Sequence, residues 1–162
     1  MEDNSRFFIK LRTVRSIAIR ILFESLKEIL TDVNINFTQE FMKISAMDGS
    51  KKAMVHLKLE TEKFEDYYCE NDINLGVNMT SLFKLIKTIN NNDTISFFVE
   101  KDEPSKLQIR IENSDKITTY KYRLLQIENT GFTIQPKEFE SIITLPSSDF
   151  QKICRDMNNM GA

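Results

Sequence analysis

The sequence predicts an α+β fold built from a repeated unit of one strand, one helix and about three further strands. Three observations lead to this prediction. Residues 73–92 change from strand alternation to a helical spacing of apolar residues. Similar transitions occur near positions 14 and 147, so helices begin about every 65 to 68 residues. The stretches between them resemble short strands joined by turns, which is typical of antiparallel sheets packed on one face.

The segment 73–92 shows the repeated unit most clearly. Ile73, Leu75 and Val77 alternate with other residues, which places their side chains on one face of a strand. At the start of the following helix, Asn78 or Thr80 can accept a hydrogen bond from a free backbone N–H group. The apolar stripe of that helix consists of Met79, Leu82, Phe83, Ile86 and Ile89. The segment contains no acidic residue, so the polar face of the helix is cationic.

The other elements follow the same two periods. An apolar run from Phe7 to Leu11 leads into a helix expected over 14–30, whose wide apolar face requires extensive packing. Turns are expected at Asp48-Gly49-Ser50 and at three later polar clusters. Alternation predicts strands over 33–37, 42–46, 53–59, 95–99, 107–111 and 117–125, and more weakly over 64–69.

The remaining sequence divides into a connector and a third, incomplete unit. Residues 126–138 have no strand or helix period, yet they contain two isolated large apolar residues, Phe132 and Ile134. We expect a surface linker with a docking role. Residues 139–162 predict a strand at Ser141–Leu145 followed by a helix over 147–160. One strand and one helix cannot bury their own apolar sides, so we expect either a fragment or strands supplied from elsewhere.

Composition limits the class of protein. The 162 residues suit one domain with a small appendage, and the polar residues 1–6 predict a flexible tail. No apolar run approaches the ~18 residues of a membrane span. Cys69 and Cys154 do not indicate a disulfide framework, which favours a reducing compartment. The single His56 lies in a strand pattern, and no phosphate-binding glycine loop is present, so we expect no enzyme, no metal site and no cofactor.

Charge separates the predicted helices from the predicted strands. The predicted helices together carry more basic than acidic residues. Because the net charge of the whole chain is −2, the remaining residues must carry a larger negative charge than that. One interpretation is that these are solvated helix faces. The other is a cationic surface that contacts phosphates without reading bases.

Three motifs resemble the eukaryotic-type DNA sliding clamp family, proliferating cell nuclear antigen. They are Leu75–Lys87, Ser45–Ser50 and Leu145–Asp156. Their order and spacing cover the first domain of a clamp subunit (7–125), the interdomain connector (126–138), and the first strand and helix of a second domain (139–162). The resemblance implies the DNA-clamp (processivity) fold, in which antiparallel sheets lie outside and two helices of the first domain lie on the inner face.

The resemblance also implies function and site residues. It implies a homotrimeric ring, when full length, that encircles double-stranded DNA through non-specific phosphate contacts and tethers DNA polymerase, the clamp loader and other motif-bearing proteins. The location implied is the nucleus, or a viral replication compartment. Its DNA-binding positions match Arg20, Lys27, Lys84, Lys87, Lys152 and Arg155, with Ile21 at a position that is usually basic. Its partner-docking groove matches Met47, Phe132, Ile134 and Phe139, and its subunit interface matches Tyr120 and Tyr122.

Two other functions remain open at this point. A checkpoint-type clamp paralogue would share the same motifs. A plain nucleic-acid-binding module would place aromatic residues beside its cations, and the helix faces lack them. Because the ring needs the rest of a second domain, we expect this chain not to close a ring by itself.

Overall fold

The computed structural model describes residues 4–128 and 138–161. The chain divides into two compact units, Met1–Phe132 and Thr133–Ala162. The first unit contains the helices α1 (Ser16–Lys27) and α2 (Met79–Ile86) and the short 3₁₀ turns η1 (Asn4–Arg6) and η2 (Thr61–Lys63). Its strands are β1 (Phe7–Thr13), β2 (Asp32–Phe37), β3 (Phe41–Met47), β4 (Met54–Glu60), β5 (Asp66–Cys69), β6 (Ile73–Asn78), β7 (Thr94–Glu100), β8 (Lys106–Glu112) and β9 (Ile117–Arg123).

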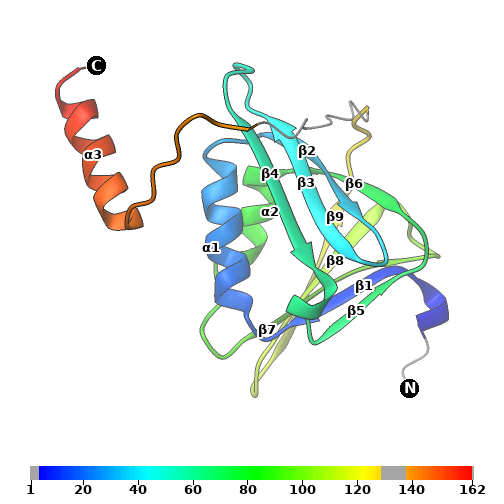
Figure 1. Ribbon diagram of the computed structural model, residues 1–162. Coiled ribbons are helices and arrows are strands. Elements are labelled where there is room, and N and C mark those ends of the chain that lie inside the picture. Colours follow the sequence, from blue (N-terminus) through cyan, green and yellow to red (C-terminus); the bar gives the residue numbers. More distant parts are fainter. Residues whose placement is uncertain (1–3, 129–137, 162) are drawn as a thin grey trace. The chain divides into compact units, whose positions relative to one another are not determined.

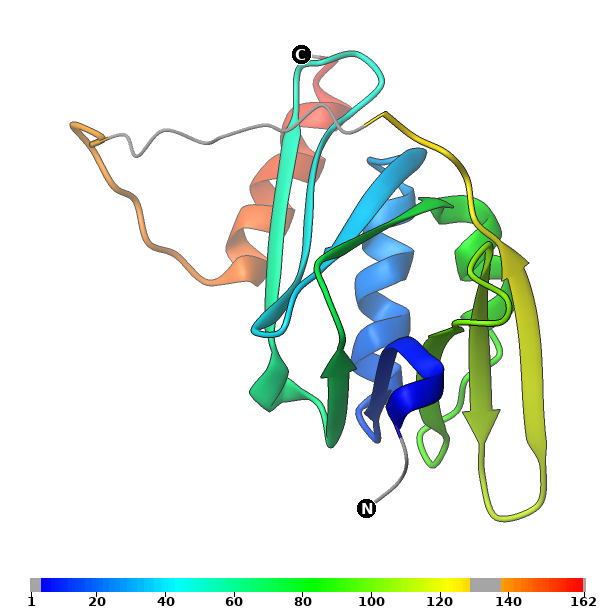
Figure 2. The same ribbon diagram turned by 90° about the vertical axis from the view of Figure 1, so that its right-hand side faces the viewer.

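The strands form two antiparallel sheets, as Figures 1 and 2 show from two sides. The five-stranded sheet has the order β5-β1-β7-β8-β9, and the four-stranded sheet has the order β4-β3-β2-β6. The first strand of each repeat joins the sheet of the other repeat, because β1 pairs with β7 and β6 pairs with β2. This exchange links both repeats into one core, and it confirms the predicted α+β fold of strand-helix-strands repeats.

The two helices pack on the inner faces of the sheets and lie along one side of the unit (Figure 1). On α2, the side chains of Met79, Leu82 and Ile86 are completely buried. On α1, the ring of Phe23 stacks on Phe97 of β7, with 6.3 Å between ring centroids. Most of the apolar stripe predicted for each helix therefore faces a shared core, whereas Val14, Ile21 and Ile29 of the apolar face predicted over 14–30 are exposed.

Asn78 ends β6 and begins α2. Its Oδ1 atom accepts a hydrogen bond from the backbone N–H of Ser81 at 2.9 Å, and its Nδ2 atom donates to Asp32 at 2.7 Å. The first of these bonds satisfies a backbone donor that has no partner inside the helix. Of the two predicted capping residues, Asn78 is therefore the one that caps the helix.

Two predicted segments differ from the structure. Ser141–Leu145, predicted as a strand, has no secondary structure and pairs with no described strand. The predicted flexible tail over 1–6 includes the ordered turn Asn4–Arg6, where Arg6 forms an ion pair with Glu100. The second unit contains α3 (Ser147–Asn159), on which Phe150, Ile153 and Met157 are all exposed.

We predict that Asn78→Ala lowers the free energy of unfolding by about 1 kcal/mol, because α2 loses its N-terminal cap. Denaturant unfolding followed by circular dichroism measures this change. Asn74→Ala is the matched control, since Asn74 lies on the same strand and accepts a single side-chain bond from Asn36. Equal effects of the two substitutions would contradict the capping role.

Candidate functional site

Basic side chains occur on both helices of the first unit. Lys84 of α2 and Lys87, which directly follows α2, are exposed, whereas Arg20 and Lys27 of α1 are partly buried. The Lys27 ammonium group lies 5.2 Å from the ring centroid of Phe83 on α2, and it also pairs with Glu28. The end of α1 that carries Lys27 is therefore in contact with the helix that carries the two exposed lysines.

Two features limit the predicted cationic surface of α1 and α2: one is an apolar residue on α1, and the other is that two predicted basic residues belong to the second unit. Ile21, at the position that is usually basic in the family, is 52% exposed. It interrupts the positive charge of α1 with an apolar side chain. Lys152 and Arg155 are exposed on α3, which belongs to the second unit, and that helix also carries Asp149 and Asp156.

A pocket of about 360 Å³ opens beside Met47 on the four-stranded sheet. Val33, Ala46 and Met47 come from β2 and β3, and Ile127 comes from the chain after β9. Because the side chain of Val33 is buried in the core and Ala46 packs against it, the large apolar side chains of the pocket are those of Met47 and Ile127, and charged residues surround them, namely Asp32, Asp48, Lys51 and Glu128. A small pocket with two apolar side chains and a polar rim is a typical site for the anchor residue of a peptide.

The chain after β9 is held in place by β6 and β2. The Leu125 amide donates to the Gly76 carbonyl at 2.8 Å, and Asn34 Nδ2 donates to the Ile127 carbonyl at 3.1 Å. A Cβ atom on Gly76 would lie only 2.1 Å from the Leu125 carbonyl oxygen. Glycine is therefore needed at position 76, because any side chain would push this wall of the pocket away.

The opposite wall is a turn organised by Asp48. Its carboxylate accepts backbone hydrogen bonds from Ser50 at 3.1 Å, Lys52 at 2.8 Å and Ala53 at 2.7 Å, and a further one from the Ser50 hydroxyl. The Ser50 hydroxyl and then the Ala53 amide are the largest causes that lower the pKa of Asp48 to about 2. The turn thus stays intact at neutral pH, and it holds Lys51 at a left-handed φ of 58° on the pocket rim.

The predicted docking residues belong to different parts of the chain. Met47 lines the pocket, Phe139 is 69% exposed in the second unit, and Phe132 and Ile134 lie outside the described residues. Ile127 was not predicted as a docking residue. The pattern that identified Phe132, a single large apolar residue between polar neighbours in the connector, also applies to Ile127.

Tyr120 and Tyr122 lie on β9, at the edge of the five-stranded sheet. Their side chains are partly buried against the core, and the Tyr122 hydroxyl accepts a hydrogen bond from the Asn78 amide at 2.9 Å. No other strand of the described chain pairs with the outer edge of β9. Any strand added there would therefore bind backbone groups of β9, while the two tyrosines support the strand from inside.

The described residues provide little for catalysis. His56 Nδ1 is 2.9 Å from Ser45 Oγ on the neighbouring strand, without a third group that would orient the pair. Burial raises the pKa of the Cys69 thiol to about 11, so it is a poor nucleophile. Within residues 4–128 and 138–161, no group of three or more His, Cys, Asp or Glu side chains could hold a metal ion. No described helix has the length and apolar character needed to cross a bilayer.

Comparison with known proteins places the chain in a family. The model of the proliferating cell nuclear antigen N-terminal domain matches residues 8–131, and that of the C-terminal domain matches residues 133–162. The chain belongs to the proliferating cell nuclear antigen family. Residues 8–131 thus correspond to the N-terminal domain of this family, and α3 lies in the portion matched by the C-terminal one.

Three relatives show how far the similarity extends. A "probable DNA polymerase sliding clamp 1" of Paramecium bursaria Chlorella virus 1 is 40% identical over 98% of this chain and 61% of its own length. The proliferating cell nuclear antigen of Dictyostelium discoideum is 28% identical over 93% of this chain and 59% of its own. The crystal structure of the Entamoeba histolytica protein superposes with a TM-score of 0.88 at 25% identity, covering 94% of this chain and 62% of that one. The chain thus spans about three fifths of the length of these clamp proteins.

We predict that Gly76→Ala lowers the free energy of unfolding by about 1–3 kcal/mol, because the new methyl group collides with the Leu125 backbone. The Leu125 amide should also exchange faster with deuterium, since its bond to Gly76 is broken. Gly49→Ala is the matched control, because no atom lies within 4 Å of the added Cβ atom. Unchanged exchange at Leu125 in Gly76→Ala would disprove the close approach.

Proposed function

We propose that this chain forms the first domain, connector and part of the second domain of a DNA sliding clamp. The observation that supports the proposal is the contact between the Lys27 ammonium group of α1 and the ring of Phe83 on α2, because it packs together the two helices that carry the basic residues. The name of the Chlorella virus relative, a probable DNA polymerase sliding clamp, supports it. In the full-length protein, three subunits would enclose duplex DNA with these helices facing the hole.

The chemistry of the helix face suits sliding. Lys84 and Lys87 are long, exposed side chains on a short rigid helix, so they contact phosphates without fixing a sequence register. Such contacts are weak and exchange rapidly, whereas retention on DNA comes from ring closure. The function therefore needs no catalytic step, and the domain acts as a tether for enzymes that carry out synthesis.

The β9 edge and the Met47 pocket supply the two protein contacts of this proposal. The free backbone edge of β9 would pair with a strand of a neighbouring subunit, with Tyr120 and Tyr122 behind it. The pocket between Met47 and Ile127 would hold the apolar anchor of a clamp-binding peptide from DNA polymerase, the clamp loader or a repair protein. The names of both curated relatives favour a replication clamp over a checkpoint paralogue. They also favour action in a nucleus or a viral replication compartment.

We predict that Lys84→Glu combined with Lys87→Glu abolishes the stimulation of processive polymerase synthesis by the full-length clamp, because the inner face then repels phosphates. Primer extension on a long template measures the effect. Lys63→Glu with Lys116→Glu makes the same change of charge at two exposed positions outside α1 and α2, and it should retain stimulation. Equal loss in both double variants would show that net charge, and not the helix face, determines DNA contact.

We predict that Met47→Ala and Ile127→Ala each weaken binding of a hydrophobic clamp-binding peptide by about tenfold, because each removes part of the pocket wall. Phe132→Ala and Ile134→Ala should also weaken it. Isothermal titration calorimetry with the full-length clamp gives the affinities. Met54→Ala is the matched control, since Met54 faces Met47 in the strand register but does not line the pocket. Unchanged affinity in all four variants would refute this docking site.

A further inference from the structure

The side of the five-stranded sheet that faces away from the helices contains an open groove of about 810 Å³. Phe97 of β7 stacks on α1, so its neighbours Ser96 and Phe98 point to the opposite face of the sheet. Both line the groove, together with side chains from β1 and β8. The groove is therefore separated from the proposed duplex-binding helices by the full thickness of the domain's sheet.

A row of hydrogen-bond donors crosses the groove. Arg12 of β1 is opposite Ser96 of β7 in the strand register, and Ser96 is opposite Arg110 of β8. Thr119 of β9 continues the row. Neighbouring strands lie about 4.8 Å apart, so the backbones of the two arginines are separated by roughly twice that spacing, with Ser96 between them. Guanidinium donors on both sides of a hydroxyl group suit the oxygens of a phosphate.

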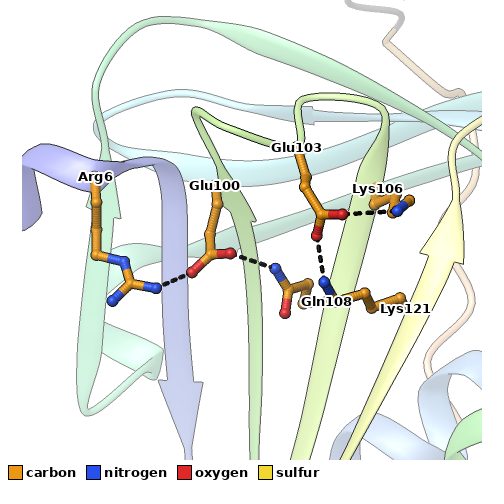
Figure 3. A network of polar contacts seen from close by, with 6 residues as sticks. All are labelled: Arg6, Glu100, Glu103, Lys106, Gln108 and Lys121. Carbon is orange, nitrogen blue, oxygen red and sulfur yellow. Dashed lines mark hydrogen bonds and ion pairs between the residues drawn. The ribbon is translucent and has the colours of Figure 1, made fainter.

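Of the two carboxylates that line the groove, Glu100 is already bound by other side chains, whereas Glu112 of β8 forms no ion pair within the described part of the chain. Glu100 accepts hydrogen bonds from Arg6 and from Gln108, the second at 2.7 Å (Figure 3), and its pKa is lowered mainly by Arg6. Asp66, which is opposite Arg12 in the register, pairs instead with Lys10 at 2.9 Å. The charges of Glu100 and Asp66 are thus offset by side chains other than Arg12 and Arg110.

The same holds in the turn between β7 and β8, next to Glu100. Glu103 binds Lys106 at 2.7 Å and also binds Lys121 (Figure 3), and these two partners lower its pKa to about 2. Neither Arg12 nor Arg110 forms an ion pair within the described part of the chain. The groove lining carries four cations against two carboxylates, so an anionic ligand would find both guanidinium groups available.

Aromatic rings form the floor beside these cations. Phe98 is opposite Lys10 in the register, and the ring of Phe7 meets it edge-on with centroids 5.6 Å apart. The Arg6 guanidinium group lies 5.0 Å from the centroid of Phe7. Aromatic side chains next to cations on an open sheet face are the combination used to bind single strands, by base stacking and phosphate contact.

We propose that this groove binds single-stranded nucleic acid, with Arg12 and Arg110 on phosphates and Phe98 stacking on a base. Paired bases inside a duplex could not reach the aromatic floor. An acidic peptide would use the arginines but would gain little from the aromatic rings beside them, so the observations favour a nucleic acid. The site is distinct from the proposed duplex contact, and it remains open when a strand pairs with the edge of β9, because such pairing uses backbone groups in the plane of the sheet.

Fluorescence anisotropy with a labelled twelve-residue oligodeoxythymidylate tests the proposal on this chain. At low salt, we expect a dissociation constant on the order of 10–100 µM. The affinity should fall as the salt concentration rises, with a log–log slope of magnitude about 1.4 to 2, which corresponds to two or three phosphates. Arg12→Ala and Arg110→Ala should each reduce that slope by about 0.7, and the double variant should bind at least about tenfold more weakly. Phe98→Leu should weaken binding about fivefold without changing the slope.

Matched variants distinguish binding in the groove from binding elsewhere on the surface. Lys116→Ala with Arg123→Ala removes two exposed cations that do not line the groove, and it should leave binding unchanged. Lys84→Glu with Lys87→Glu should weaken duplex binding and spare the oligodeoxythymidylate, so failure of the clamp proposal and failure of this one are distinguishable. Melting curves confirm that each variant folds.

Two results would overturn the proposal. The first is unchanged oligodeoxythymidylate binding in the folded Arg12→Ala, Arg110→Ala double variant. The second is polyglutamate binding as tight as that of the oligonucleotide and insensitive to Phe98→Leu, which would assign the groove to an acidic peptide.

Discussion

The fold depends on the exchange of one strand between its two repeats. β1 precedes α1 in the chain yet pairs with β7 of the second repeat, and β6 precedes α2 yet pairs with β2 of the first. Neither repeat completes a sheet by itself, so the two must fold as one cooperative unit. Because each helix directly follows its exchanged strand, the exchange also holds α1 against α2. The cationic helix face is thus a consequence of sheet topology.

The docking pocket follows from the same exchange. β6 forms the edge of the four-stranded sheet beside β2, and Gly76 on that strand lets the Leu125 backbone approach. Asn34 on β2 then binds the Ile127 carbonyl, which places Ile127 across the pocket from Met47. A residue without a side chain in the middle of a strand usually weakens a sheet. Here it is needed so that the start of the connector forms a wall of the pocket.

Local pattern was sufficient to predict most elements, and it failed where structure depends on partners. The stripe from Met79 to Ile86 and the strand alternation are properties of short windows, and both were confirmed. Ser141–Leu145 has a strand-like sequence but no described pairing partner, so periodicity alone misassigned it. Ile127 and the row of Arg12, Ser96 and Arg110 escaped prediction for a related reason. The three residues of the row come together through strand register between segments about 14 to 100 residues apart, and Ile127 reaches the pocket through a hydrogen bond to Asn34, which is 93 residues away in the sequence.

Net charge by segment is a coarse guide to where a protein meets polyanions. The strands and loops hold the negative excess of this chain, yet on the outer sheet much of that charge is held in ion pairs, such as those of Glu100 and Glu103. A paired carboxylate no longer repels an approaching phosphate as a free one would, because its field is largely offset at short range and screened beyond it. What remains effective is the cation that found no partner, as at Arg110. The ion-pair pattern, more than the charge total, therefore decides which surface of a nearly neutral domain can hold a nucleic acid.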